Sequence, residues 1–285
     1  MTPPTVTLKS DAEIESIRRA GAIAAGILRQ IRETATTGMT TADLDAIAAA
    51  GFERGGAEPL FLGYSQGGAT PFPANTCISV NEQIVHGIPG DRVLQRGDVV
   101  SVDVGLRLDG WCADTATTFI VDGEADHPAE RLIEETRRGL ETAVREIRPG
   151  RRWSEVGAIL ERMAFDAGYG IVTEYVGHGL GRTLHEPPKA PAYATGFRGD
   201  DFELQAGMVL AVEPMLTIGR GTLGDGPGPD GLPGWRTRVK LESDGWTVVT
   251  ADGSIACHEE HTIAVTSTGC EVLTRPVVEI SHEMR

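Results

Sequence analysis

Two acidic residues interrupt apolar runs that are typical of buried β-strands. Asp103 lies within the run at residues 99–104, and Glu213 lies within the run at residues 208–215. Burying an ionised carboxylate costs several kcal/mol unless it is paired or binds a metal ion. The chain must therefore fold so that each of these carboxylates meets a positive charge inside the protein.

A two-residue turn fixes how Asp103 lies relative to another acid, Asp114. The dipeptide Asp109-Gly110 between two alternating runs predicts a β-hairpin with these residues at its tip. Position 108 then faces 111 and position 105 faces 114. Asp103 and Asp114 therefore share one face of the sheet, as diagonal neighbours about 7–8 Å apart. A solvated hairpin with two surface acids is the competing interpretation, and the apolar run at 99–104 argues against it.

A histidine and two further glutamates extend the set of candidate ligands. His178 lies in the glycine-rich segment 177–181, where the missing side chains allow close approach, and His185 follows seven residues later. A lone histidine is more often a structural residue, but both histidines lie between the hairpin and Glu213. Glu259 and Glu260 precede a last apolar strand, and spacing alone does not decide which of them joins the set.

Four carboxylates and one imidazole form an oxygen-rich donor set. Such a set suits two divalent ions of borderline hardness, namely Co, Mn, Fe or Zn. Two ions about 3.5–4 Å apart lower the pKa of a bound water towards neutrality. Metal-assisted hydrolysis is therefore the reaction class that these residues predict.

Helical and β-type segments alternate in two similar blocks. Capping signals and helical periodicity predict helices near residues 11–28, 41–53, 129–147 and 154–167. Apolar or alternating runs predict strands near residues 77–80, 98–104, 115–121, 208–213, 246–250 and 261–265. This order predicts an α+β fold with an antiparallel sheet flanked by helices and an internal pseudo-twofold duplication. We expect a single catalytic domain over 1–285, with an N-terminal extension at 1–10 and a C-terminal tail at 275–285.

Charge and cysteine content argue against several classes of protein. The 285-residue chain has a formal net charge of −15 and a pI near 4.9, which argue against nucleic acid as a specific partner. The sequence has no apolar run of bilayer length, and its first residues lack a signal-peptide core. Four scattered cysteines without a C-x-x-C pair fit a reducing compartment. We expect a cytoplasmic monomer that binds no membrane.

The order of several short motifs resembles that of the type I methionine aminopeptidases, a family with the pita-bread fold. The resemblance covers residues 10–270 and rests on segments from both blocks: CISVNE (77–82), VHGIP (85–89), SVDVG (101–105), DT (114–115), GHGLG (177–181), HEP (185–187), EPM (213–215), GWTV (245–248) and EHT (260–262). It implies a dinuclear metallopeptidase that releases methionine from the N-termini of nascent polypeptides when the second residue is small.

The resemblance also implies roles for the ligands that spacing cannot give. Asp103 would hold one ion, and His178 and Glu213 would hold the other. Asp114 and Glu260 would bridge both ions. Glu213 would in addition act as the general base.

Further residues would act on the substrate in a protein of this family. His185 would hydrogen-bond the scissile peptide group, and His86 would orient the substrate near its N-terminus. The pocket for the methionine side chain would be formed by Tyr64, Phe72, Cys77, Leu184 and Trp246.

The sequence departs from the family pattern at a few positions. The link between Tyr64 and Phe72, residues 65–71, is longer than usual. Phe61 stands where a small residue is common, and Leu184 stands where an aromatic residue is common. Position 258 is histidine, where glutamine is usual. None of the five metal ligands departs from the family pattern. We expect the loops 65–71 and 219–234 to flank the mouth of the active site.

Two other interpretations compete with this one. An X-Pro aminopeptidase or prolidase of the same fold usually has an extra N-terminal domain, for which the residues before Asp103 leave no room. A non-catalytic pita-bread binding module would have lost metal ligands.

A transient ribosome contact would require a local basic patch, for which Arg151-Arg152 and residues 236–240 are candidates.

Overall fold

The computed structural model describes residues 6–65, 70–123, 126–195, 201–218 and 236–275. Its helices are α1 (Asp11–Thr34), α2 (Thr41–Gly55), α3 (Pro128–Glu146) and α4 (Trp153–Ala167). Its strands are β1 (Glu58–Pro59), β2 (Cys77–Val80), β3 (Gln83–Val85), β4 (Val99–Leu108), β5 (Trp111–Ile120), β6 (Gly170–Ile171), β7 (Gly177–Gly179), β8 (Glu186–Ala190), β9 (Val209–Val212), β10 (Met215–Thr217), β11 (Val239–Leu241), β12 (Val248–Thr250), β13 (Ala256–His258), β14 (His261–Val265) and β15 (Cys270–Val272).

Side chains at the helix starts satisfy backbone groups that α1 and α2 leave free. Ser10 and Glu13 form the predicted capping box, in which the Ser10 backbone N–H donates to Glu13 Oε2 at 2.8 Å. Thr40 and Asp43 form a second capping box for α2, which ends at Gly56 in the left-handed conformation. The helices begin close to where the sequence predicts, and the first two extend further than predicted.

The hairpin of β4 and β5 has the predicted register. Leu108 pairs with Trp111 and Gly105 pairs with Asp114. Asp109 and Gly110 both have positive φ angles, 51° and 78°, as a two-residue hairpin turn requires. Strand β5 begins at Trp111 rather than at 115, because the ladder continues without a break up to the turn.

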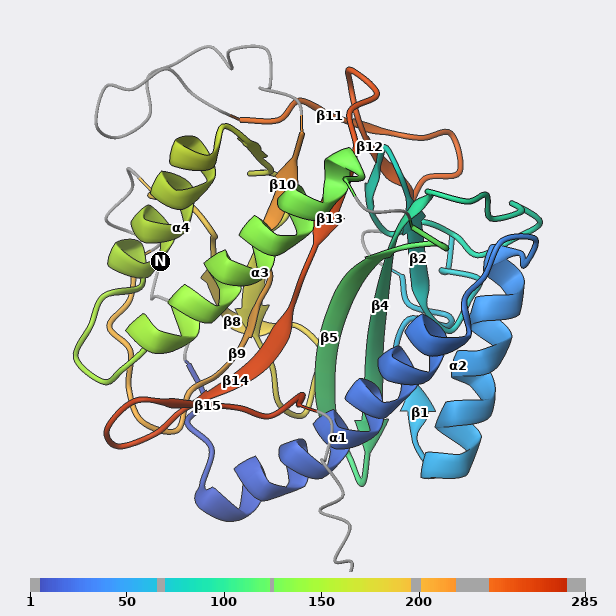
Figure 1. The fold of residues 1–285 in the computed structure, drawn as a ribbon. Helices are drawn as coiled ribbons and strands as arrows, with labels where there is room; N and C mark the ends of the chain where they lie inside the picture. Colours follow the sequence, from blue (N-terminus) through green and yellow to red (C-terminus); the bar gives the residue numbers. More distant parts are fainter. Residues whose placement is uncertain (1–5, 66–69, 124–125, 196–200, 219–235, 276–285) are drawn as a thin grey trace, which may run out of the picture.

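Each block of the sequence forms a pair of helices packed on antiparallel strands (Figure 1). Helices α1 and α2 cover the sheet with the order β1-β4-β2, in which β5 also pairs with β4. Helices α3 and α4 share a core with β9 and β14, which belong to the sheet with the order β15-β14-β9-β7-β8. Figure 1 shows α1 and α3 on the same side of the strands. This arrangement follows the predicted order of helices and strands in both blocks.

The two blocks meet where β5 lies beside β14. The Thr262 hydroxyl donates to the Asp114 carbonyl at 2.7 Å and accepts from the Asp114 N–H at 3.0 Å. The Thr115 hydroxyl donates to the Glu260 carbonyl at 2.8 Å, and the Glu260 N–H donates to the Ala116 carbonyl at 3.0 Å. We call the contact made by these bonds the seam. It places Asp114 of β5 next to Glu260, which precedes β14.

Some sequence predictions concern segments that the structure describes only in part. The loop 219–234 lies outside the described residues, and so do most of the N-terminal extension and the C-terminal tail. Of the loop 65–71, residues 65, 70 and 71 are described. In the described part of the chain, no helix combines the length and hydropathy needed to cross a membrane.

Candidate metal centre and substrate pocket

The five predicted ligands come from both blocks and meet at one cavity of about 560 Å³. Asp103 lies on β4, Asp114 on β5 and His178 on β7, while Glu213 follows β9 and Glu260 precedes β14. Three of them are buried, and one ligand atom of each of these three lies within 4.8 Å of the others: Asp114, His178 and Glu260. The fold thus assembles a compact group of carboxylates around an imidazole.

The facing atoms in this group are spaced further apart than hydrogen-bonded atoms. His178 Nε2 lies 3.8 Å from Asp114 Oδ2 and 3.9 Å from Glu213 Oε1. Hydrogen bonds from nitrogen to oxygen span about 2.7–3.2 Å, whereas two atoms that bind one ion at about 2.0–2.2 Å lie about 3–4 Å apart. His178 Nδ1 donates to the Gly179 carbonyl at 2.9 Å, which leaves Nε2 free to act as a ligand.

Unpartnered atoms and shifted pKa values show that the group suits a divalent cation. Asp103 Oδ1, Asp114 Oδ1 and His258 Nε2 are buried without a hydrogen-bond partner among the described residues. Burial, and after it the neighbouring acids, raise the pKa of Asp103 and of Glu260 well above the usual range. Burial raises the pKa of Asp114 to about 6. A divalent ion would partner these atoms and offset the repulsion between the carboxylates.

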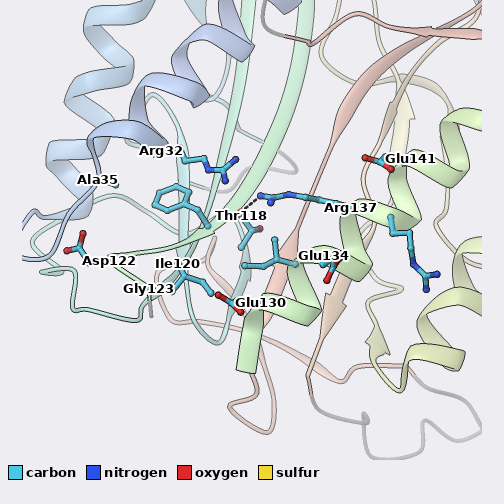
Figure 2. Close-up of a pocket in the computed structure, with 13 residues that line it drawn as sticks. Arg32, Ala35, Thr118, Ile120, Asp122, Gly123, Glu130, Glu134, Arg137 and Glu141 are labelled. Atoms are coloured by element: carbon cyan, nitrogen blue, oxygen red, sulfur yellow. Dashed lines mark hydrogen bonds between the residues drawn. The ribbon is translucent and has the colours of Figure 1, made fainter. Parts of the chain in front are cut away.

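Glu259 points away from this group, so Glu260 is the glutamate that faces it. The Glu259 carboxylate accepts from Arg137 Nε at 2.9 Å and from the Thr118 backbone N–H at 3.0 Å. Figure 2 shows Arg137 reaching Thr118 at a second cavity of about 820 Å³, which lies between α1 and α3. This geometry decides between the two glutamates, which spacing along the chain could not.

The other end of the 560 Å³ cavity is apolar and aromatic. Phe72 and Trp246 pack edge to face with ring centroids 5.4 Å apart, and Trp246 Nε1 donates to the Thr70 carbonyl at 2.8 Å. Cys77 pairs with Asp103 across β2 and β4, so the apolar end adjoins the carboxylates. The predicted pocket residues line this cavity together with Phe61: Tyr64, Phe72, Cys77, Leu184 and Trp246.

Two histidines, His86 half-buried and His185 exposed, line the cavity between the carboxylates and the apolar end. The Tyr64 hydroxyl and His185 Nδ1 are 2.9 Å apart, and the rings of His185 and His178 have centroids 4.2 Å apart. The ring of His86 packs edge to face with Tyr175 at 5.3 Å. Burial lowers the pKa of both His86 and His185 to about 4, so both rings are neutral near pH 7. A neutral imidazole donates one hydrogen bond and accepts another.

Sequence reasoning did not place Tyr175 or His258 at this cavity, which both of them line. Tyr175 shows no periodic signal, because it lies in a short irregular segment before β7. His258 stood out only as a departure from the family pattern. It lies two residues before Glu260, and side chains two apart on a strand share a face. That spacing was the signal that could have found it.

Comparisons with known proteins identify relatives over nearly the whole chain. Residues 15–267 match metallopeptidase family M24. A methionine aminopeptidase of Clostridium acetobutylicum is 40% identical over 270 residues, which are 94% of this chain and 98% of that protein. Methionine aminopeptidase 1 of Bacillus subtilis is 38% identical, over 95% of this chain and 99% of that protein.

Solved structures give the same result for the fold. The crystal structure of a methionine aminopeptidase from Thermotoga maritima is similar with a TM-score of 0.84 and 38% identity, over 95% of this chain and 100% of that chain. A prolidase from Pyrococcus furiosus has a TM-score of 0.69 at 22% identity, over 94% of this chain and 65% of that chain. The predicted α+β pita-bread fold is therefore confirmed.

Proposed function

Because the chain belongs to metallopeptidase family M24 and, within it, to the methionine aminopeptidases, we propose that it releases N-terminal methionine from polypeptides whose second residue is small. The observation that supports this proposal is that one cavity is lined by both candidate metal-binding and apolar side chains. A carboxylate and histidine group adjoins an apolar pocket lined by Phe72 and Trp246. The pocket would hold the methionine side chain while the carboxylate group acts on the peptide bond that follows it.

The carboxylates and His178 would hold two divalent ions. Asp114 and Glu260 would serve both ions, Asp103 would serve one of them, and Glu213 with His178 would serve the other. When bound, such ions supply Lewis acidity and an activated water. Oxygen-rich sets of this kind suit Co, Mn, Fe or Zn.

Glu213 is placed to carry a proton during the reaction. Burial raises its pKa, but its interactions with His258 and His178 outweigh burial and hold the pKa below its usual value. The carboxylate is therefore ionised near neutral pH. It would take a proton from the attacking water and pass it to the leaving amine, as a general base and then an acid.

His185 and His86 would bind the peptide as neutral rings. With the Tyr64 hydroxyl donating to His185 Nδ1, the proton of the neutral His185 ring lies on Nε2. That N–H would donate to the scissile carbonyl oxygen as charge develops there. His86 lines the same cavity and would orient the N-terminal end of the peptide.

The proposal also covers the oligomeric state, the cellular location and the partners of the protein. We propose one catalytic domain that acts as a monomer in the cytoplasm on the N-termini of nascent polypeptides. A transient ribosome contact would use one of two basic segments, Arg151-Arg152 or residues 236–240. An X-Pro peptidase is not favoured, because methionine aminopeptidases of Clostridium acetobutylicum and Bacillus subtilis are 40% and 38% identical to this chain, whereas the prolidase is 22% identical.

A panel of short peptides tests the proposed specificity. The metal-reconstituted protein should hydrolyse Met-Ala-Ser and should act much more slowly on Leu-Ala-Ser, on a peptide with a bulky second residue and on an X-Pro peptide. Cleavage of the X-Pro peptide with Met-Ala-Ser left intact would instead assign the chain to the prolidase branch. Reconstitution with Co, Mn, Fe and Zn singly would rank the metals.

A further inference from the structure

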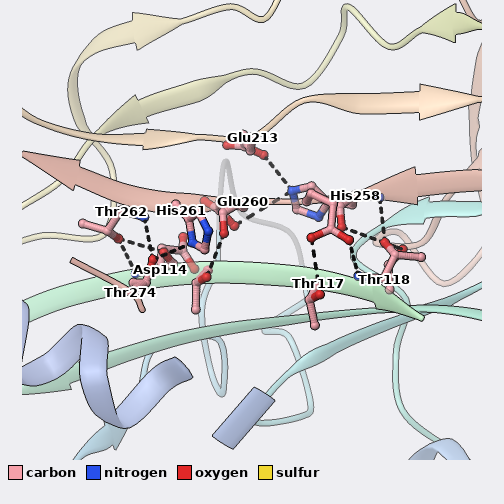
Figure 3. Close-up of polar contacts among 12 residues, drawn as sticks. Asp114, Thr117, Thr118, Glu213, His258, Glu260, His261, Thr262 and Thr274 are labelled. Carbon is pink, nitrogen blue, oxygen red and sulfur yellow. Dashed lines mark hydrogen bonds and ion pairs between the residues drawn. The ribbon is translucent and has the colours of Figure 1, made fainter. Parts of the chain in front are cut away.

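His258 lies at the edge of the carboxylate group, and its backbone is hydrogen-bonded both to β10 and to Thr118 of β5. It is the last residue of β13 and pairs with Met215 of β10. Its N–H donates to the Thr118 hydroxyl at 3.1 Å, and the same hydroxyl donates to the His258 carbonyl at 2.7 Å. These contacts fix the backbone, so the side chain has a defined direction. Figure 3 shows the ring pointing towards Glu213 and Glu260.

The ring nitrogen of His258 faces two carboxylates at distances that suit a shared ion. His258 Nε2 lies 3.4 Å from Glu213 Oε2 and 3.9 Å from Glu260 Oε2. Both separations exceed the usual N–H···O range of about 2.7–3.2 Å. Two donors on one ion at about 2.1 Å, separated by a tetrahedral angle, lie about 3.4 Å apart.

The two histidines flank Glu213 in equivalent ways. His178 Nε2 faces Glu213 Oε1 at 3.9 Å, and His258 Nε2 faces Glu213 Oε2 at 3.4 Å. The His258 side chain is 3% exposed, and its Nε2 has no hydrogen-bond partner among the described residues. A buried polar atom of this kind requires a partner, and within the described ranges the other two such atoms belong to Asp103 and Asp114.

We propose that His258 Nε2 is a ligand of the metal ion that Glu213 and Glu260 hold, so that this centre has two imidazole ligands. The inference rests on the proposed function in that it requires the chain to bind divalent ions, but it does not require peptide hydrolysis. A second imidazole makes the donor set softer. It shifts the preference away from Mn and towards Co and Zn, which bind nitrogen more strongly.

Proton NMR of the cobalt-loaded protein counts the imidazole ligands directly. Each histidine bound to Co(II) through Nε2 gives one strongly shifted, exchangeable N–H signal from Nδ1. The wild type should show two such signals, and His258→Gln and His178→Gln should each show one. A single wild-type signal that persists in His258→Gln and disappears in His178→Gln would overturn the proposal.

Metal affinity supplies a second readout that needs no substrate. We expect His258→Gln to weaken Zn binding, measured by competition with a chelator, on the order of 10- to 100-fold, as loss of a group supporting a metal site does. Mn binding should weaken much less, so the ratio of the two affinities should fall. Equal weakening of both metals would mean that His258 only supports Glu213, and the proposal would be rejected.

Matched variants separate ligand loss from misfolding. His258→Asn tests whether a shorter amide behaves as glutamine does, and the thermal unfolding of each metal-free variant should stay close to that of the wild type. Because these measurements use metal alone, a chain that binds Zn with two imidazoles but cleaves no peptide would sustain this inference and refute the proposed function.

Discussion

At the scale of single residues, Asp114 and Glu260 differ from the other candidate ligands in how they are fixed. Both are buried, and both are bonded through their backbones across the seam of β5 and β14. His86 and His185 line the same cavity, where His86 packs against Tyr175 and His185 Nδ1 lies 2.9 Å from the Tyr64 hydroxyl. We therefore expect Asp114 and Glu260 to control metal content, and His86 and His185 to control turnover.

Paired substitutions test this division of roles. Asp114→Asn removes a carboxylate that we propose serves both ions, so activity on Met-Ala-Ser should disappear and bound metal should fall. His185→Ala removes the proposed donor to the scissile carbonyl, so kcat should fall by about 10²–10³-fold while metal content stays near the wild-type value. Metal content by atomic emission and kcat on the same preparations check both. Loss of metal from His185→Ala would show that the division is wrong.

The sequence predicts some of these residues better than others, for physical reasons. Asp103 and Asp114 follow from the turn at Asp109-Gly110, because a two-residue hairpin fixes the register of both strands. Glu260 does not follow in the same way. Alternation places Glu259 and Glu260 on opposite faces, but only the packing of Arg137 against Glu259 shows which face is the site.

At the scale of elements, β7 places His178 between two other strands. It pairs with β9 on one side and with β8 on the other. A Cβ atom on Gly177 would lie 2.4 Å from the Ala211 carbonyl oxygen and 2.9 Å from the Ala190 carbonyl oxygen. Both oxygens belong to paired strands, whose backbones cannot move apart without breaking their hydrogen bonds. The strand therefore tolerates only glycine at position 177.

Gly177→Ala should therefore act on both stability and metal binding. We expect a loss of about 1–3 kcal/mol in the free energy of unfolding, typical of overpacking, and weaker metal binding because His178 must move with the strand. Gly26→Ala is the matched control: its Cβ meets nothing within 4 Å on α1, and alanine is the better helix former. Denaturant unfolding of both variants checks this. Equal stability of Gly177→Ala and wild type would contradict the account of β7.

Individual helices and the hairpin could be predicted from the sequence, but the seam could not. Periodicity and capping act over a few residues, so Ser10 and Glu13 mark the start of α1 reliably. The contact between β5 and β14 joins segments far apart in the chain and leaves no local pattern. The resemblance to a known family implied only that Asp114 and Glu260 would share metal ions.

At the scale of the whole molecule, the segment before α1 is tied to the second block beside the site. Lys9 Nζ and Glu186 Oε2 form an ion pair at 2.7 Å, with side chains 3% and 15% exposed. Glu186 also accepts from the backbone N–H groups of Arg182 and Thr183. Glu186 directly follows His185, so this pair connects the start of the described chain to a residue that we propose binds the substrate.

Lys9→Met should destabilise the protein in a pH-dependent way. The loss should be up to about 3 kcal/mol, the lower end for a broken buried pair, because Glu186 keeps its two N–H donors. Burial raises the pKa of Glu186, but Lys9 and these N–H groups outweigh burial and hold it below its ordinary value of 4.5. The stabilisation is thus present above pH 4.5 and is lost as the pH falls through the lower folded-state pKa.

Unfolding by denaturant at several pH values checks this prediction. The stability difference between wild type and Lys9→Met, both metal-free, should be constant above about pH 5 and should shrink towards pH 3. A difference that is constant over the whole range would assign the effect of the substitution to packing rather than to the ion pair.

The central claim is that the carboxylate and histidine group turns this fold into a peptidase by binding divalent ions. Titration of the chelator-stripped protein with Co or Mn, following Met-Ala-Ser hydrolysis and bound metal in the same samples, tests it most directly. We predict no hydrolysis without metal, a rise in activity that parallels bound metal, and saturation once the group is filled. Full activity in protein shown to hold no metal, or full metal occupancy without any hydrolysis, would contradict the account.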